Sequence, residues 1–230
     1  PGETRLDLSK TNSCITKEVC SEIVKYTKDA IIVMTANPVD ILTYVTLKET
    51  GYPPNQIIGS GTLLDTARFR YLLGKHLGVD PRSVHAYIIG EHGDSELPVW
   101  STATVGGVPI NKFCHKHPPD ICQATLDQIF DEVKNAAYEI IARKGATYYA
   151  IGWGLKRLVQ AIIMDQKSVL TVSTLLDDYH GISDVCLGIP AVVGRAGVDR
   201  IVELELSEDE LVKLSDSARL LQDMQRKVGY

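Results

Sequence analysis

The sequence predicts an α/β fold in which a parallel sheet at the front is followed by an α+β region with antiparallel sheet. Two short apolar runs, 30–34 and 57–60, flank a helical segment at 38–49, and a strand–helix–strand unit of this spacing forms parallel strands. Further along, the side chains of 201–206 alternate between apolar and acidic, which is typical of a half-exposed antiparallel strand. This change of character favours a domain boundary near residue 60.

The other elements are predicted from periodicity and from end signals. Thr62 and Ser207 each begin a capping-box pattern that ends in an acidic residue three positions later, which predicts a helix start. Apolar residues at helical spacing, or in short β-branched runs, indicate the remaining segments. The predicted helices are 12–27, 38–49, 62–77, 121–141, 147–164 and a closing helix after Ser207, and the further strands are 84–89, 169–174 and 185–193.

The composition excludes several classes of protein. The 230 residues have ordinary hydrophobic and charged fractions, and the net charge of −5 gives no reason to expect binding to nucleic acid or to an anionic membrane. No apolar run reaches the roughly 18 residues that a membrane helix needs, and no signal peptide is visible. Five cysteines without paired spacing favour reduced thiols and a cytoplasmic protein.

The strongest candidate for chemistry is the segment 90–95, with the sequence GEHGDS. It follows the predicted strand 84–89, and ligands bind at strand ends in α/β proteins. Upstream, Asp65 and Arg68 share one face of a predicted helix. A histidine, a carboxylate and a guanidinium suit proton transfer to a small carboxylate substrate. Taken singly, His92 could be an ordinary surface or core histidine, and Asp65 a helix cap paired with Arg68.

Three further patterns carry less weight. Cys114, His115, His117 and Cys122 lack the paired spacing of a zinc site, so no metal is expected. The glycine pairs of the chain do not match G-x-G-x-x-G, so the sequence has no dinucleotide fingerprint. Arg5 lies in a polar segment before the first predicted helix, where a solvated surface arginine is the ordinary alternative.

Taken together and in order, several segments resemble the L-lactate dehydrogenases, close to the bacterial form. The matching segments are GETRL at 2–6, TANPVD at 35–40, GSGT at 59–62, DTARFR at 65–70 and GEHGDS at 90–95. The resemblance extends from Pro1 to the final helix.

The resemblance implies two domains. Residues 1–59 would be the C-terminal part of a Rossmann NAD-binding domain, and 60–230 would be the catalytic domain with antiparallel sheet. The family's glycine-rich loop and ribose-binding acidic residue come before the matching segments. We therefore expect that the chain lacks the N-terminal part of the NAD-binding domain, whether naturally, by cleavage, or because that part was recorded separately.

The resemblance also implies the reversible, NADH-dependent reduction of pyruvate to L-lactate. His92 resembles the acid/base that gives a proton to the carbonyl oxygen. Asp65 resembles the residue that accepts the other ring N–H and raises the pKa of the histidine. Arg68 would hold the substrate carboxylate through two hydrogen bonds. Arg5 would polarise the ketone from a loop that closes over the site and excludes water.

Other matching positions would surround the substrate and cofactor. Asn37 resembles a residue that touches both. Thr147 and Ile151 would close the pocket. The nicotinamide half of NAD would contact Thr35, Ala36, Asn37, Ser60 and Ile151.

Arg70 and His85 match the pair with which allosteric bacterial members bind fructose bisphosphate at a subunit interface. Arg70 is about 200° around the helix from Arg68, so it should face away from the substrate. A basic pair repeated across a two-fold axis suits a ligand with two phosphates. The resemblance thus implies a homo-oligomer, in particular a tetramer, with this effector.

Two alternatives stay open. The first is a malate dehydrogenase of the same fold, whose discriminating residue would precede Pro1. Thr147 and the stretch 91–100 favour the lactate enzyme, because the threonine fills room that a larger substrate would need. The second is a non-catalytic fragment that retains the effector site and the subunit interface but cannot hold NAD.

Overall fold

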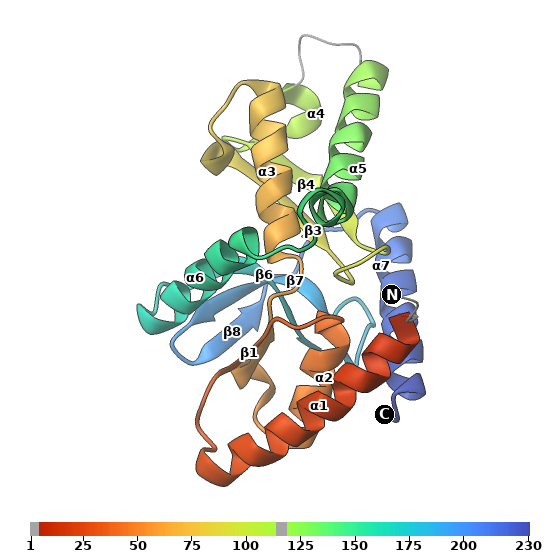
Figure 1. Ribbon diagram of the computed structural model, residues 1–230. Coiled ribbons are helices and arrows are strands. Elements are labelled where there is room, and N and C mark those ends of the chain that lie inside the picture. Colours follow the sequence, from red (N-terminus) through yellow and green to blue (C-terminus); the bar gives the residue numbers. More distant parts are fainter. Residues whose placement is uncertain (1–4, 114–118) are drawn as a thin grey trace.

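The computed structural model describes residues 5–113 and 119–230 (Figure 1). Its helices are α1 (Arg5–Tyr26), α2 (Val39–Thr50), α3 (Leu63–Leu77), α4 (Ile110–Phe113), α5 (Pro119–Lys144), α6 (Tyr149–Ile163) and α7 (Glu208–Lys227), with short 3-10 turns at Pro54–Gln56 and Pro81–Ser83. Its strands are β1 (Ile32–Met34), β2 (Ile57–Gly59), β3 (Val84–Ile89), β4 (Leu97–Val105), β5 (Val108–Pro109), β6 (Ser168–Leu176), β7 (Val185–Gly194) and β8 (Gly197–Ile201).

The strands form two sheets, and the larger one mixes parallel and antiparallel pairs. β1 and β2 are parallel, with Ile32 opposite Ile57, as the strand–helix–strand spacing predicts. β2 then pairs antiparallel with β6, which gives the order β1-β2-β6-β7-β8. The smaller sheet, β3-β4-β5, is antiparallel. The predicted α/β fold is confirmed, and its larger sheet draws strands from both sides of residue 60.

Two apolar clusters fix the elements that carry the candidate site. In the first, Ile41 of α2 packs with residues of β3, β7 and α7. In the second, Phe69 and Leu73 of α3 pack against β3, β4 and α5. Figure 1 shows the resulting arrangement, with α3 and α5 beside the smaller sheet and α1 and α2 beside the larger one. The start of α3 and the end of β3 are thereby held by buried contacts on both sheets.

The first helix begins earlier than the periodicity predicts. The expected range was 12–27, whereas α1 begins at Arg5, so the expectation that residue 5 precedes the first helix in a loop is wrong. The side of α1 that is buried carries the small side chains Ser9, Ser13, Thr16 and Cys20 at helical spacing, and α1 packs on α2. A stripe of small polar residues lacks the apolar signal on which the prediction depended.

The strand predicted at 201–206 is also wrong. The strand at this place is β8, which ends at Ile201. The alternation is nevertheless reflected in burial, since Leu204 is buried between exposed acidic neighbours. Its backbone N–H donates to the Tyr179 hydroxyl at 3.1 Å, so a side chain satisfies the donor that a neighbouring strand would otherwise bind.

The hairpin of β4 and β5 was not predicted, although its turn has a clear signal. Gly106 and Gly107 connect the two strands with φ values of +55° and +84°. Two consecutive positive φ angles are what a tight hairpin turn requires, and glycine adopts them at the least cost. Gly106 and Gly107 are one of the glycine pairs that fail to match the dinucleotide fingerprint, and the hairpin turn explains them instead.

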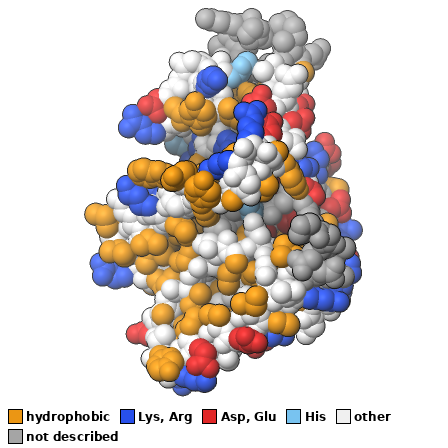
Figure 2. Space-filling view, in the orientation of Figure 1, with side chains coloured by type: hydrophobic (Ala, Val, Ile, Leu, Met, Phe, Trp, Pro, Cys, Tyr) orange, Lys and Arg blue, Asp and Glu red, His pale blue; other side chains and the backbone are white. Residues whose placement is uncertain are grey.

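Exposed apolar side chains gather over α6, at the left of Figure 2. They include Tyr149, Trp153, Val159 and Ile163, of which Trp153 is 68% exposed. Large apolar patches on a folded protein mark interaction surfaces. Within the described ranges, no helix has both the length and the apolar character needed to cross a bilayer.

The contact of Gly197 with the Pro54–Gln56 turn gives a stability prediction. Gly197 has φ +95°, and a Cβ there would lie 1.9 Å from the backbone oxygen of Asn55. Gly197→Ala should therefore lower the free energy of unfolding by about 3 kcal/mol or more. Gly78 has φ +69° with no atom near its Cβ position, so Gly78→Ala should cost only about 1 kcal/mol. Urea denaturation followed by circular dichroism measures both, and equal losses would contradict the steric argument.

Candidate active site

The structure brings together the histidine and the carboxylate that the sequence singled out. His92 Nδ1 lies 2.8 Å from Asp65 Oδ2, although the two residues are separated by most of α3 and all of β3. Asp65 is in the first turn of α3 and is 6% exposed. His92 follows the end of β3 through Gly90, whose φ is +95°. A histidine held by a carboxylate through one nitrogen is free to exchange a proton with a ligand through the other.

The first turn of α3 is not held by the predicted capping box. The Thr62 side chain makes no cap hydrogen bond, and its hydroxyl instead donates to the Ile88 carbonyl of β3 at 2.6 Å. Thr66 accepts the Ile88 N–H through its hydroxyl at 3.0 Å. These bonds tie the start of α3 to the end of β3, so they hold Asp65 and His92 at a fixed separation. The second capping box, Ser207 with Glu210, is present as predicted.

The electrostatic surroundings of His92 favour its protonated form. Burial alone would lower the pKa of the ring, but the hydrogen bond to Asp65 and the charges of Asp65, Asp40 and Glu96 outweigh it. The pKa of His92 is raised from 6.5 to about 9. At neutral pH the side chain is therefore an imidazolium, which is the form that can donate a proton to a bound ligand.

Glu96, which the sequence analysis missed, is a third acidic group of the site. It is 7% exposed, and its carboxylate lies in a cluster with Asp65 and His92 whose nearest polar atoms are all within 4.8 Å of one another. Burial and then the Asp65 charge raise the pKa of Glu96 to about 8, against the opposing effects of His92, Lys134 and Arg68. Its Oε1 is buried and has no hydrogen-bond partner within the described part of the chain.

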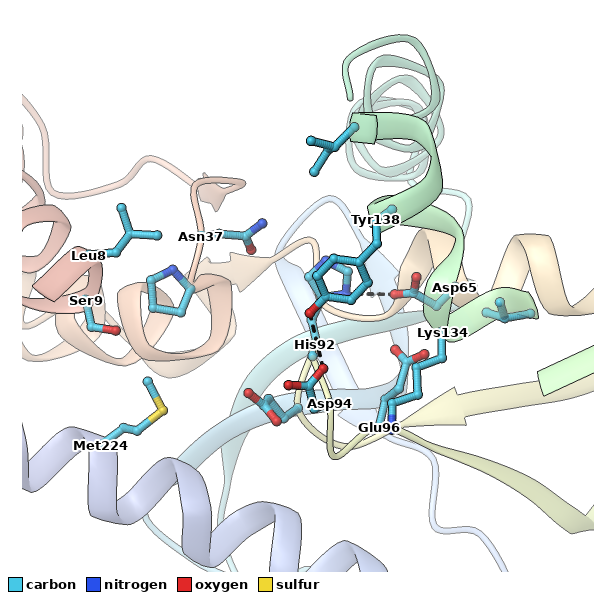
Figure 3. A pocket seen from close by; sticks show the side chains of 16 residues that line it. Leu8, Ser9, Asn37, Asp65, His92, Asp94, Glu96, Lys134, Tyr138 and Met224 are labelled. Carbon is cyan, nitrogen blue, oxygen red and sulfur yellow. Dashed lines mark hydrogen bonds and ion pairs between the residues drawn. The ribbon is translucent and has the colours of Figure 1, made fainter. Parts of the chain in front are cut away.

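These side chains line a cavity of about 240 Å³ (Figure 3). Asn37 reaches it from the end of β1, and Lys134 and Tyr138 reach it from α5. The Tyr138 hydroxyl donates to Asp94 at 3.2 Å across the opening. The volume suits a small organic acid, and the wall carries an acid–base pair.

Other predicted substrate and cofactor residues lie outside this wall. Arg68 has a guanidinium nitrogen 3.7 Å from Asp65 Oδ1, but it does not line the cavity. Thr147 is exposed between α5 and α6, and Ile151 is half-buried on α6; neither contributes to the lining. The side chain of Arg5 lies outside the described residues, as does the Cys114–His117 cluster.

Two further predicted cofactor contacts, Thr35 and Ala36, are exposed directly after β1, whereas Ser60 is buried after β2.

Arg70 and His85 occupy neighbouring elements away from this cavity. Arg70 Nε donates to the Ala86 carbonyl at 2.9 Å, and its guanidinium lies over the Tyr87 ring. Arg70 lines a second cavity of about 260 Å³. His85 is exposed on β3 and is not part of that lining. Arg70 thus lines the second cavity and not the one beside His92.

Models of known protein families match nearly the whole chain. A model described as the lactate/malate dehydrogenase NAD binding domain matches residues 1–59, and one described as the lactate/malate dehydrogenase alpha/beta C-terminal domain matches residues 62–229. The chain belongs to the lactate/malate dehydrogenase family.

Relatives in this family are similar over nearly the whole chain. The L-lactate dehydrogenase of Acetivibrio thermocellus is 50% identical over 223 residues, which cover 97% of this chain and 70% of that protein. The L-lactate dehydrogenase of Bacillus velezensis is 51% identical over 97% of this chain and 70% of its own length. The chain therefore spans about 70% of the length of these relatives.

Solved structures of lactate dehydrogenases have the same fold as this chain. A lactate dehydrogenase from a Medee basin deep-sea metagenome library has a TM-score of 0.95 at 43% identity and covers 100% of this chain and 73% of that one. The ligand-bound minor L-lactate dehydrogenase of Enterococcus mundtii has a TM-score of 0.93 at 46% identity, with 99% and 72% covered. The family supports NAD as the cofactor.

The residues present fit the nicotinamide half of NAD. β1 and β2 are parallel, and the exposed residues Thr35, Ala36 and Asn37 follow β1, with Asn37 on the wall of the cavity that His92 also lines. The carboxyl ends of parallel strands are where such folds bind dinucleotides. Gly59 at the end of β2 has no room for a Cβ, which would lie 2.3 Å from Thr43 Oγ1, so the strand end is packed closely beneath this opening.

The His92–Asp65 pair gives a direct prediction. In Asp65→Asn, the hydrogen bond to a charged acceptor and its charge are lost, so burial dominates and the pKa of His92 should fall to 6.5 or below. Asp94→Asn also removes a carboxylate from the cavity wall and should leave the pKa of His92 close to 9. Titration of the His92 ring by NMR distinguishes them, and an unchanged pKa in Asp65→Asn would contradict the assignment.

Proposed function

We propose that this chain catalyses the NADH-dependent, reversible reduction of pyruvate to L-lactate. The observation that carries the proposal is the His92–Asp65 pair on the wall of a cavity sized for a small acid. Relatives that are about 50% identical over 97% of the chain are named L-lactate dehydrogenases, which favours pyruvate over the larger substrate of a malate dehydrogenase.

His92 acts as the proton donor in this scheme. As the imidazolium, it gives a proton through Nε2 to the carbonyl oxygen of pyruvate, while Asp65 holds the proton on Nδ1 and stabilises the charge. In the reverse direction, neutral His92 accepts the hydroxyl proton of lactate. When bound, NADH supplies the hydride that completes the reduction at the carbonyl carbon.

The remaining predicted residues complete the site. We assign Arg68 to the substrate carboxylate and Arg5 to the ketone oxygen, because guanidinium groups bind both through charged hydrogen bonds. Asn37 is assigned to substrate and cofactor, and its place on the cavity wall supports this. Thr147 and Ile151 would reach the ligands only if α5 and α6 closed over the cavity, as active-site elements often do.

Along the cofactor, Thr35, Ala36 and Ser60 would contact the nicotinamide half, in a domain that covers 1–59 and precedes a catalytic domain over 60–230. The parallel β1–β2 pair supports this division.

We further propose a homotetramer activated by fructose bisphosphate and located in the cytoplasm. The apolar patch over α6 supports self-association. Arg70 and His85 lie on adjacent elements away from the candidate active site, where a ligand with two phosphates could be shared between subunits. The free thiols of Cys14, Cys20 and Cys186 suit a reducing compartment.

His92→Asn tests the reaction. It should lower pyruvate reduction by about 10³-fold or more while NADH binding stays close to normal, because the ring acts on the substrate proton. His76→Asn replaces an exposed histidine of α3 and serves as the control. In the parent chain, kcat/KM for pyruvate should fall as pH rises through about 9, where the imidazolium is lost.

NADH oxidation at 340 nm measures turnover, and quenching of tryptophan fluorescence measures NADH binding. Unchanged turnover in His92→Asn would contradict the role of His92. Absence of quenching in the parent chain would favour a non-catalytic chain that retains only the effector site and subunit interface.

Arg70→Gln and His85→Asn test the effector site. Each should abolish activation by fructose bisphosphate and leave the rate without effector unchanged, because neither residue lines the catalytic cavity. Lys75→Gln, at an exposed position of the same helix as Arg70, should keep the activation. The measurement is the ratio of rates with and without effector, and activation that survives both changes would contradict this site.

A further inference from the structure

Asp40 is a buried carboxylate that contacts the segment carrying His92. It lies in the first turn of α2, is 2% exposed, and accepts the backbone N–H of His92 through Oδ2 at 2.7 Å. The two residues are 52 positions apart. Asp40 therefore links α2, which follows the candidate nicotinamide site, to the segment that presents the acid–base group.

The groups around Asp40 leave it ionised at neutral pH. Burial, and to a smaller extent the charge of Glu91, raises the pKa of Asp40 to about 6. The Ser173 hydroxyl of β6, the His92 N–H and the His92 charge act in the opposite direction. Burial, and then the charge of Asp40, raises the pKa of the Cys186 thiol on β7. The N-terminus of α2 also favours a negative charge at this position.

Burying this charge needs an explanation other than stability. An asparagine could accept the same N–H without the cost of desolvating a carboxylate. Among the residues that the structure describes, Asp40 Oδ1 has no hydrogen-bond partner, so the carboxylate is not fully compensated. The feature that the carboxylate adds over an amide is its negative charge, which contributes to the raised pKa of His92.

Asp40 provides one of three sets of hydrogen bonds that hold the backbone of the consecutive residues Gly90, Glu91 and His92. Gly90 exchanges two backbone hydrogen bonds with Gly188 of β7, each at 2.9 Å. The N–H of Glu91 donates to the Ser217 hydroxyl of α7 at 2.8 Å. Of these anchors, only Asp40 is charged, so it fixes the backbone of His92 and also acts on the ring electrostatically.

We propose that Asp40 is a positioning residue for the acid–base step, holding the backbone of His92 and keeping a second negative charge near its ring. The inference rests on the proposed function, in which His92 must be an imidazolium to donate. Groups that face His92 from other elements are Asp65 on α3 and Glu96 before β4, with Lys134 of α5 acting on Glu96. Asp40 acts together with Asp65 and does not line the cavity.

The test compares Asp40→Asn with Ser217→Ala. Asp40→Asn keeps an acceptor for the His92 N–H but removes the charge, so the pKa of His92 should fall by about one pH unit. The alkaline limb of kcat/KM for pyruvate should move by the same amount. Ser217→Ala removes the neutral hydroxyl that accepts the Glu91 N–H. It should lower kcat about tenfold and leave both the pKa of His92 and the alkaline limb of kcat/KM unchanged.

NMR titration of the His92 ring in the full chain supplies the pKa without requiring turnover. An unchanged His92 pKa in folded Asp40→Asn, or an equal shift in Ser217→Ala, would overturn the proposal. Absence of turnover in the parent chain would contradict the proposed function alone.

Ser173→Ala provides a second variant that does not alter the charge itself. In the parent chain the His92 resonance should show a minor inflection near pH 6, where Asp40 is protonated. Loss of the Ser173 hydroxyl, which favours the ionised carboxylate, should move this inflection to higher pH. An inflection that stays in place, or is absent from the parent chain, would contradict the coupling of Asp40 to His92.

Discussion

The hydrogen bond between His92 and Asp65 is the interaction on which the site depends. Its two partners come from an irregular segment and from a helix start, and neither element would fix the other alone. Thr62 and Thr66 provide the connection, because both hydroxyls bind the backbone of Ile88. The apolar packing of α3 on β3 also keeps the hydrogen-bond donor and acceptor at a fixed distance.

The junction of the two sheets sets where this pair lies relative to the rest of the chain. Gly188 of β7 bonds to Gly90, and a Cβ on Gly188 would lie 2.6 Å from Thr62 Oγ1. The backbones of β7 and of the segment after β3 thus meet beside the Thr62 side chain, where a side chain on Gly188 would not fit. His92 then lies next to α2, where its backbone N–H bonds to Asp40.

Much of the fold could be predicted because its signals are local. The strand–helix–strand unit and the cap at Ser207 depend on residues close in sequence, and both are confirmed. Thr62 shows the limit of such reasoning. Its capping pattern is real, but a carbonyl 26 residues away binds the hydroxyl, and a sequence pattern contains no information about that competitor.

The candidate site was predicted in part for the same reason. His92 was identified from its flanking glycines and Asp65 from the helix face that it shares with Arg68, and the family resemblance joined them, but Asp40 and Glu96 were not identified. Asp40 stands in a helix start, where an acidic residue has an ordinary explanation. Glu96 adjoins a strand that was itself missed. In each case the informative property is burial of a carboxyl group, which appears only when distant elements pack together.

The buried carboxyl of Glu96 has a consequence for which molecules enter the cavity. With a pKa of about 8, this group is largely uncharged at neutral pH, so an incoming organic anion is not repelled by it. In alkaline solution the same wall gains a negative charge, and an anionic ligand then encounters repulsion as well as the loss of the imidazolium. Under the proposed function, an anionic substrate would therefore enter most readily at a pH where His92 is the imidazolium.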